Sequence, residues 1–343
     1  MKRRSAFAVR AVALAAALTG CGGEPPGDAA PAVVRLGYFA NVTHAPALVA
    51  LEQGLFSEAL GPRETLETRV FNAGPEAVEA LFSEALDIAY IGPNPAINAF
   101  AQSGGEAIRI VAGATSGGAA LVVHPSITAP AQLRGAKLAS PQLGNTQDVA
   151  LRAWLKQQGL EANLEGAGDV SILPQANAQT LETFRAGEIQ GAWVPEPWAS
   201  RLVLEGGGSV LVDEANLWPG GKFVTTHVVV RTAFLREQPA LLEGLLRGHV
   251  RAIDFLNAEP AQGREIVNAA IAKSTGKALP AAVIERAWAN LAFTVDPLAA
   301  SLRKSAQDAT AVGLLDPVSL DGIYDVTELN AILAAAGKPR VSL

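Results

Sequence analysis

The sequence has 343 residues, 49% hydrophobic and 17% charged, with a formal net charge of −6. This composition is too apolar for an intrinsically disordered chain and too weakly charged for a nucleic-acid-binding protein. A single cysteine excludes an intrachain disulfide, a multi-cysteine zinc site and an iron–sulfur cluster. Four scattered histidines leave little room for a histidine-rich metal site. We therefore expect no metal ion and no cofactor, and the length predicts two domains.

Residues 1–20 have the pattern of an export signal. Basic residues precede the apolar run Ala11 to Leu18, and the Leu-Thr-Gly-Cys sequence at 18–21 resembles the bacterial lipobox, whose cysteine is lipidated. The alternative is an uncleaved membrane anchor, but the run is far shorter than the roughly 20 residues of a spanning helix. We expect cleavage before Cys21 and a lipid on Cys21, which places the protein in the periplasm or on the outer face of the cell membrane.

Cleavage changes the charge and exposes a linker. It removes four basic residues and leaves 23 basic against 33 acidic residues, a net charge of −10. That charge excludes a polybasic surface for membranes or nucleic acids. Residues 21–32 are rich in Gly and Pro and predict a flexible tether.

Strands and helices alternate along the rest of the chain. Hydrophobic periodicity predicts strands at Val33–Phe39, Leu66–Phe71, Asp87–Gly92, Ile108–Thr115, Val170–Leu173, Gly191–Val194 and Thr225–Arg231. It predicts helices at Ala45–Leu60, Pro75–Ala85 and Thr146–Gln158, and further helices beginning near Pro239, Pro260, Pro280 and Pro297. This alternation predicts an α/β fold with mostly parallel sheets.

A weak internal repeat indicates two similar lobes. The segment 43–48 resembles 146–151, and 87–91 resembles 190–194, both at an offset of 103 residues. Pro93-Asn94-Pro95 resembles Pro195-Glu196-Pro197 at an offset of 102. The alternative is the general likeness of all βαβ units. If the repeat is real, the repeated loops follow strands, where α/β sheets bind ligands, and both sets line one cleft.

Three loops offer hydrogen-bond donors to an anion. Asn41 and Thr43 in one loop, and Asn145 and Thr146 in another, stand just before helices, whose free N–H groups and dipoles favour negative charge. Ordinary helix capping is the alternative for all four. His44 either donates to an anion or caps the helix. The third loop holds Thr115 and Ser116, with a simple turn as its alternative.

Two proline-flanked motifs present one polar side chain each. Proline restricts its own backbone and that of the residue before it, so Asn94 and Glu196 are rigidly held. Trp193 and Trp198 flank Glu196, and they either wall an alkyl or aryl group or pack in the core. Glu196 alternatively pairs with Arg201. We find no catalytic arrangement such as a nucleophile elbow or paired carboxylates and predict that the protein is not an enzyme.

Several of these motifs together resemble the sulfonate/nitrate/taurine family of substrate-binding proteins of ABC importers, and most closely its aliphatic sulfonate-binding branch. The resemblance runs from about Val33 to Leu333. It lies in the segments 37–47, 71–75, 87–96, 113–118, 141–148 and 193–198.

The resemblance implies a type II periplasmic-binding-protein fold, with two α/β lobes around a ligand cleft. Residues 33–118 and 231–343 would form the first lobe, and 119–230 the second. The family's anion loops fall on Asn41, Thr43, His44, Asn94, Thr115, Ser116, Asn145 and Thr146, and its aromatic loop falls on Trp193, Glu196 and Trp198.

The resemblance also implies a function. We expect a monomer that captures a small organic anion, an aliphatic sulfonate above all, and delivers it to an ABC permease and its ATPase. We expect the hydroxyl groups of Thr43, Ser116 and Thr146 to surround the sulfonate oxygens. The alternative is a cofactor-biosynthesis (pyrimidine-related) enzyme or binding protein on the same fold.

Overall fold

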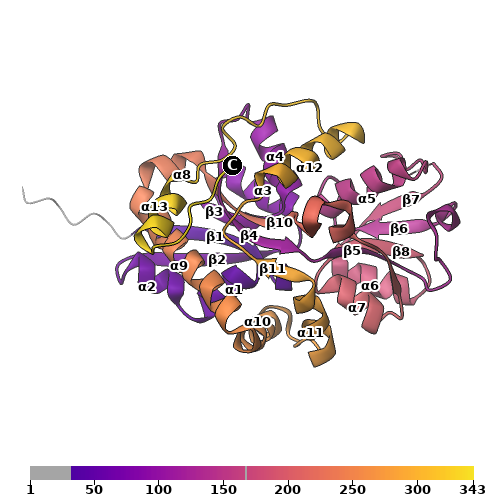
Figure 1. Ribbon diagram of the computed structural model, residues 1–343, viewed down its shortest axis with the longest axis horizontal. Coiled ribbons are helices and arrows are strands. Elements are labelled where there is room, and N and C mark those ends of the chain that lie inside the picture. The colour runs from indigo at the N-terminus through magenta and orange to yellow at the C-terminus, as the bar shows by residue number, and fades with distance from the viewer. Residues whose placement is uncertain (1–31, 167) are drawn as a thin grey trace, which may run out of the picture. The chain divides into compact units, whose positions relative to one another are not determined.

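The computed structural model describes residues 32–166 and 168–343. The predicted export signal at 1–20, Cys21 and the predicted tether up to residue 31 lie outside the described residues. Two sheets organise these residues, one in each half of the ribbon in Figure 1. The first sheet has the strand order β11 (Leu291–Phe293), β4 (Ile108–Gly117), β10 (Val224–Arg231), β3 (Ile88–Ile91), β1 (Val33–Phe39) and β2 (Thr65–Phe71). The second has the order β7 (Ser171–Pro174), β6 (Lys137–Ser140), β8 (Gly191–Pro195), β5 (Ala119–Val123) and β9 (Ser209–Asp213).

The two sheets repeat one topology, which supports the internal repeat seen in the sequence. In the first, β1 pairs in parallel with β2 and β3, and β10 is antiparallel to β3. In the second, β6 pairs in parallel with β7 and β8, and β5 is antiparallel to β8. The prediction of mostly parallel sheets holds for β1 to β3 and for β6 to β8, but β10 and β5 enter each sheet from the opposite lobe and run antiparallel to their neighbours.

Helices cover both faces of the first sheet. Along β1, Val34, Leu36 and Tyr38 pack on one face, and Phe39 packs on the other. The first face is covered by α1 (Ala45–Glu52), α2 (Leu55–Leu60), α9 (Pro239–Ala258), α10 (Pro260–Thr275), α11 (Ala281–Ala289) and α13 (Thr327–Ala335). The other is covered by α3 (Gly74–Phe82), α4 (Pro93–Gln102) and α12 (Ala299–Ala311), and α8 (Thr232–Glu237) follows β10.

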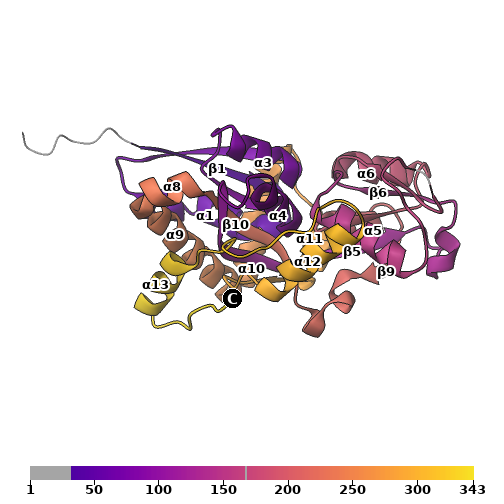
Figure 2. The same cartoon turned by 90° about the horizontal axis from the view of Figure 1, so that it is seen from above.

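The second sheet is covered in the same way, by α5 (Thr146–Gln157) on one face and by α6 (Asn177–Arg185) and α7 (Trp198–Leu204) on the other. Short 3₁₀ turns lie at Val42–His44, Pro130–Leu133, Glu214–Leu217 and Pro219–Gly221. The view from above in Figure 2 separates the helices of the two halves, with α5 and α6 beside the second sheet.

Two crossings join the lobes. The first is the Gly117-Gly118 pair between β4 and β5, where both glycines have positive φ. The second is the segment between β9 and β10. Because β10 pairs with β3 and β4, residues 224–230 belong to the first sheet, not to the second lobe in which the sequence placed them.

The prediction of one continuous helix over residues 45–60 is wrong. The segment forms two helices, because Gly54 has a φ of 68° and breaks the chain between α1 and α2. Within the described residues, no helix is both long and apolar enough to cross a membrane.

Candidate functional site

Loops from both lobes meet at the carboxyl ends of the parallel strands. After β1 the chain turns through Val42–His44 into α1, and after β3 it enters α4 directly at Gly92. In the second lobe, β6 leads through residues 141–145 into α5. The strand ends are the usual ligand position in such sheets.

These loops enclose a cavity of about 30 Å³ between the lobes. Seven lining residues come from the first lobe: Phe39, Asn41, Thr43, His44, Gly74, Gly92 and Pro95. Thr225 on β10 adds to that side, and the second lobe contributes Asn145, Thr146, Gln147 and Pro195. No lysine, arginine, aspartate or glutamate is among the described residues that line it.

Thr146 presents a free hydroxyl group. Its Oγ1 atom is buried and has no hydrogen-bond partner within the described chain. Thr146 is the first residue of α5, and Asn145 caps that helix by accepting a hydrogen bond from Asp148 N at 2.9 Å. The hydroxyl therefore lies beside the positive end of a helix dipole, which favours an anion.

His44 is an uncharged acceptor at Nδ1. Its Nε2 lies 3.3 Å from the Tyr90 carbonyl, which can only accept, so Nε2 carries the hydrogen. Nδ1 then accepts from the Thr43 hydroxyl at 3.1 Å. Burial lowers the pKa of His44 to about 3, so the ring carries no charge at neutral pH. Thr43 donates to His44, and its hydrogen is not free for a ligand.

Two side-chain amides, those of Asn41 and Gln147, accept hydrogen bonds at their oxygen atoms and keep their nitrogen atoms as donors. Trp198 Nε1–H, which can only donate, lies 3.1 Å from Asn41 Oδ1, so the other end of Asn41 is the N–H₂ group. Asn145 Nδ2 donates to Gln147 Oε1 at 3.3 Å, which leaves Gln147 Nε2. No hydrogen bond from Asn41 Nδ2 or Gln147 Nε2 is found within residues 32–166 and 168–343. With Thr146, the residues that line the cavity carry three uncharged donor groups, one from the first lobe and two from the second.

Comparisons with known proteins identify the family of this chain and its fold. Residues 27–272 match the model of the NMT1-like family. The chain belongs to the NMT1-like family. The taurine-binding periplasmic protein of Escherichia coli is 28% identical over 216 residues, which are 63% of this chain and 64% of the relative. This NMT1-like protein thus aligns with just under two thirds of that relative. A putative aliphatic sulfonates-binding protein of Escherichia coli is 26% identical over 261 residues, 75% of each chain.

Solved structures share the two-lobed periplasmic-binding-protein fold. The alkanesulfonate-binding protein SsuA from Xanthomonas axonopodis, bound to MOPS, has a TM-score of 0.68 and 24% identity, covering 84% of this chain and 96% of its own. The nitrate-binding protein NrtA from Synechocystis has a TM-score of 0.75 and 17% identity, covering 90% and 89%. The predicted fold class and family resemblance are confirmed.

Five of the eleven predicted ligand residues of the NMT1-like protein line the cavity. They are Asn41, Thr43, His44, Asn145 and Thr146. Sequence reasoning missed Phe39, Gly74, Gly92, Pro95, Gln147, Pro195 and Thr225. Pro95 and Pro195 belong to the proline-flanked motifs, which therefore carry a signal for the site. In each motif a proline lines the cavity, and the polar residue between the prolines does not.

The other predicted residues make contacts outside the cavity lining. Asn94 Nδ2 donates to the Ser305 carbonyl at 3.2 Å, and Thr115 Oγ1 donates to the Thr43 carbonyl at 2.6 Å. Ser116 is buried on β4. Of these three residues, Thr115 contacts a lining loop directly, at Thr43.

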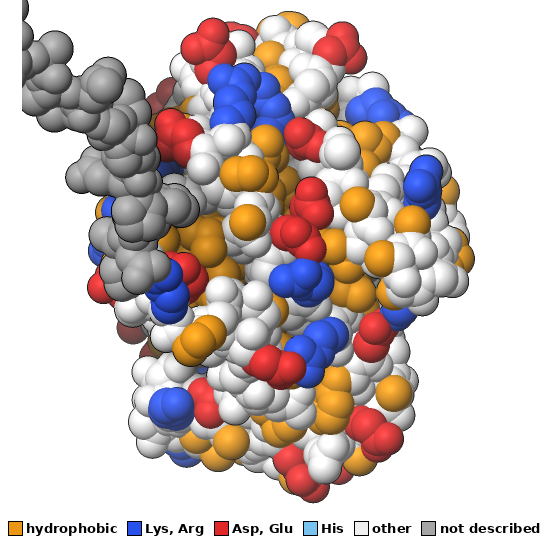
Figure 3. Space-filling model, turned by 90° about the vertical axis from the view of Figure 1, so that its left-hand side faces the viewer, with side chains coloured by type: hydrophobic (Ala, Val, Ile, Leu, Met, Phe, Trp, Pro, Cys, Tyr) orange, Lys and Arg blue, Asp and Glu red, His pale blue; other side chains and the backbone are white. Residues whose placement is uncertain are grey.

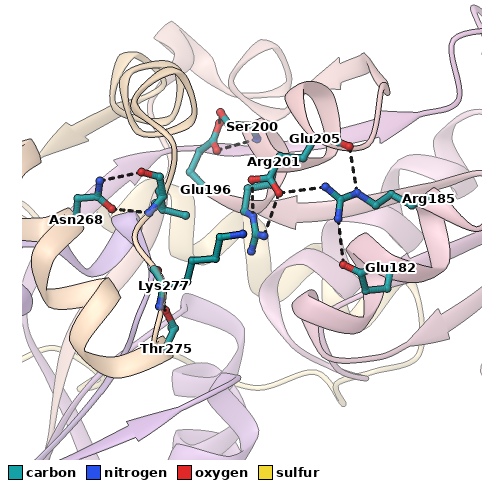
Figure 4. A network of polar contacts seen from close by, with 10 residues as sticks. Glu182, Arg185, Glu196, Ser200, Arg201, Glu205, Asn268, Thr275 and Lys277 are labelled. Carbon is teal, nitrogen blue, oxygen red and sulfur yellow. Dashed lines mark hydrogen bonds and ion pairs between the residues drawn. The ribbon is translucent and has the colours of Figure 1, made fainter.

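Glu196 is a bridge between lobes. Its carboxylate accepts hydrogen bonds from Ser200 N and Oγ, each at 3.0 Å, and from Asn290 Nδ2 of the first lobe at 2.8 Å. Figure 4 shows the Ser200 side of this contact. Burial raises the pKa of Glu196, and the three donors oppose that rise. Arg201, the predicted alternative partner, pairs with Glu205 instead.

Trp193 is a core residue. It is fully buried in the second lobe, where its Nε1 donates to Glu214 Oε2 at 2.7 Å. Trp218 Nε1 donates to the other oxygen of Glu214 at 3.4 Å. Burial raises the pKa of Glu214 to about 7, against a usual value of 4.5. Glu214 carried no signal in the sequence, because only the folded chain surrounds it with two indole rings.

Replacing Glu214 with glutamine should make the protein less sensitive to alkaline pH. The raised pKa keeps a proton on folded Glu214 while the unfolded chain releases it, so the contribution to stability is present below pH 4.5 and is lost as pH rises to 7. A change from 4.5 to about 7 corresponds to about 3 kcal/mol. Urea unfolding at pH 5 and pH 8 measures the effect. Between these pH values the free energy of unfolding of the wild type should fall by roughly this amount more than that of the variant. An equal pH dependence in both proteins would contradict this assignment.

Proposed function

We propose that this NMT1-like protein is an extracytoplasmic substrate-binding protein of an ABC importer. It captures a small organic anion, an aliphatic sulfonate above all, and delivers it to a permease with its ATPase. The observation that carries the proposal is the cavity between the lobes, with free donors on Asn41, Thr146 and Gln147. The names of the taurine-binding and sulfonate-binding relatives support the ligand class.

Uncharged donors suit an anion in an acidic protein. Long-range attraction is unfavourable at a formal net charge of −6, so affinity must come from local dipoles. A hydrogen bond to a charged group contributes roughly 1.5–3 kcal/mol, and the start of α5 adds its dipole. A sulfonate stays ionised at any physiological pH and offers three acceptor oxygens to these three donors.

Binding without catalysis is the second part of the proposal. The lining side chains of the described cavity include no carboxylate or lysine, and His44, with a pKa of about 3, is a poor base at neutral pH. The taurine-binding and aliphatic sulfonates-binding relatives are named as binding proteins. A pyrimidine-related ligand, the alternative from the sequence, has no specific support from the lining residues.

The lobes close on the ligand in this proposal, and a lipid on Cys21 holds the protein at the membrane as a monomer. Contacts between the lobes support closure: Lys156 Nζ in α5 donates to the Ala311 carbonyl at the end of α12, at 2.5 Å.

On the face of the first lobe in Figure 3, acidic and basic side chains are interspersed, as on a solvated surface.

A ligand panel tests the function. Thermal unfolding is measured with alkanesulfonates, taurine, nitrate, bicarbonate and pyrimidines. A ligand at 100 times its Kd should stabilise the fold by about 2.7 kcal/mol. We expect the sulfonates or taurine to give this shift, with calorimetric titration supplying the Kd. If only pyrimidines raise the melting temperature, or if no sulfonate raises it, the proposal is contradicted.

A further inference from the structure

The indole ring of Trp198 reaches from the second lobe to the first. Trp198 begins α7, and its Nε1 donates to Asn41 Oδ1 at 3.1 Å. The Arg201 guanidinium lies over the indole ring, 4.6 Å from its centre. Glu205 in turn holds Arg201 through contacts of 2.9 and 3.1 Å, as Figure 4 shows. The ring is thus fixed by its own lobe while its N–H points at the other.

This contact fixes the orientation of the Asn41 side-chain amide. A free asparagine can present either its oxygen or its nitrogen to a cavity, and the two ends have opposite preferences for an anion. The indole N–H can only donate, so it holds the oxygen and leaves Nδ2 as the free end. Asn41 is 7% exposed and lines the cavity. Without the indole, the Asn41 oxygen could face the anion and repel it.

We propose that Trp198 is a positioning residue for ligand binding, which orients Asn41 as a donor when the lobes close. The inference rests on the proposed function. It replaces the predicted role of Trp198 as a wall of the cavity, because Trp198 is outside the lining and acts through Asn41. Closure then completes the donor set: the second lobe brings Thr146 and Gln147 directly, and it sets the donor of the first lobe through Trp198.

A double-mutant cycle tests the coupling. Trp198→Phe removes the N–H and keeps an aromatic ring, and Asn41→Ala removes the amide. Calorimetric titration with taurine and with ethanesulfonate gives the Kd of the wild type, both single variants and the double variant. We expect Trp198→Phe to weaken binding about five- to tenfold in the wild-type background. In the Asn41→Ala background we expect less than a twofold effect.

A second variant covers the case in which Trp198→Phe does not fold. Asn41→Asp keeps the size of the side chain and an acceptor for the indole, but it has no donor and adds a negative charge. Asn41→Asp should bind ethanesulfonate more weakly than Asn41→Ala does. If Asn41 only fills space, Asn41→Asp should instead bind ethanesulfonate more tightly than Asn41→Ala does. Melting temperatures without ligand confirm folding of each variant.

The outcomes separate the two proposals. Equal weakening by Trp198→Phe in both backgrounds, or tighter binding by Asn41→Asp than by Asn41→Ala, would overturn the positioning role and leave the proposed function intact. A folded wild type that binds neither probe would overturn the proposed function, and this inference with it.

Discussion

Replacing Gly92 with alanine should weaken sulfonate binding 100-fold or more. Gly92 stands at the start of α4 in the first lobe, and a Cβ atom there would lie 2.3 Å from Thr146 Oγ1 of the second. Two atoms cannot stay so near, so either the Thr146 hydroxyl group rotates away from the ligand or the lobes stay apart. Loss of the second lobe's donors, at roughly 1.5–3 kcal/mol for each bond to a charged group, accounts for a change of this size.

The fold itself should tolerate this change. The backbone at Gly92 has φ −71° and ψ 165°, which alanine adopts freely, and alanine as the capping residue costs about 0.5–1 kcal/mol. Calorimetric titration, with melting curves of the ligand-free protein beside it, separates lost binding from lost stability. Normal affinity in Gly92→Ala would show that the lobes do not approach as the structure has them.

Thr146→Ala supplies the matched control. It removes the colliding oxygen, and the next atom, Thr146 Cβ, lies at an ordinary contact distance of 3.4 Å. In the Thr146→Ala background, Gly92→Ala should change the Kd less than about threefold, because only the collision couples the two positions. Small-angle scattering should show that this double variant closes on the ligand and that Gly92→Ala alone does not.

Much of the fold could be predicted because its elements carry local signals. Strand β1 alternates its faces, β3 is a short run of buried apolar residues, and α5 begins with an Asn cap. Sheet direction at β10 could not be predicted. Its sequence suits a buried strand of either direction, and its place beside β3 and β4 depends on the chain's return from the second lobe.

The sequence also predicts one part of the site, the residues at helix starts, and not another, the direction of the hydrogen bonds. Residues at helix starts, such as Asn41 and Thr146, have a physical signal in the sequence and line the cavity. The direction in which a side chain donates its hydrogen bond has no such signal in the sequence. Thr43 resembled a donor, but the tautomer of His44, set by the distant Tyr90 carbonyl, takes up its hydrogen. Trp193 and Trp198 looked equivalent beside Glu196, but neighbours distant in sequence place one in the core and one across the lobes.

Replacing Asp148 with alanine should lower the free energy of unfolding by about 3–5 kcal/mol, because breaking one side of a buried ion pair leaves the other charge unpaired. Asp148 is fully buried and lies 3.1 Å from Arg152 Nε, one helical turn along α5. Its oxygens also accept from Ser140 Oγ at 2.7 Å and Gly144 N at 3.0 Å. Urea unfolding measures the loss.

An exposed ion pair with the same spacing along a helix isolates the effect of burial. Glu243 and Arg247 have the same spacing on α9 and the same order of charges, at 2.6 Å, but both side chains face solvent. Glu243→Ala should cost at most about 1 kcal/mol. Adding Arg152→Met to Asp148→Ala should restore part of the stability, because the unpaired buried charge is then gone. Equal costs for the two acid-to-alanine changes would mean that Asp148 acts as a surface residue. A larger cost for Asp148 would instead show that burial, and not spacing along the helix, decides how much the ion pair contributes to stability.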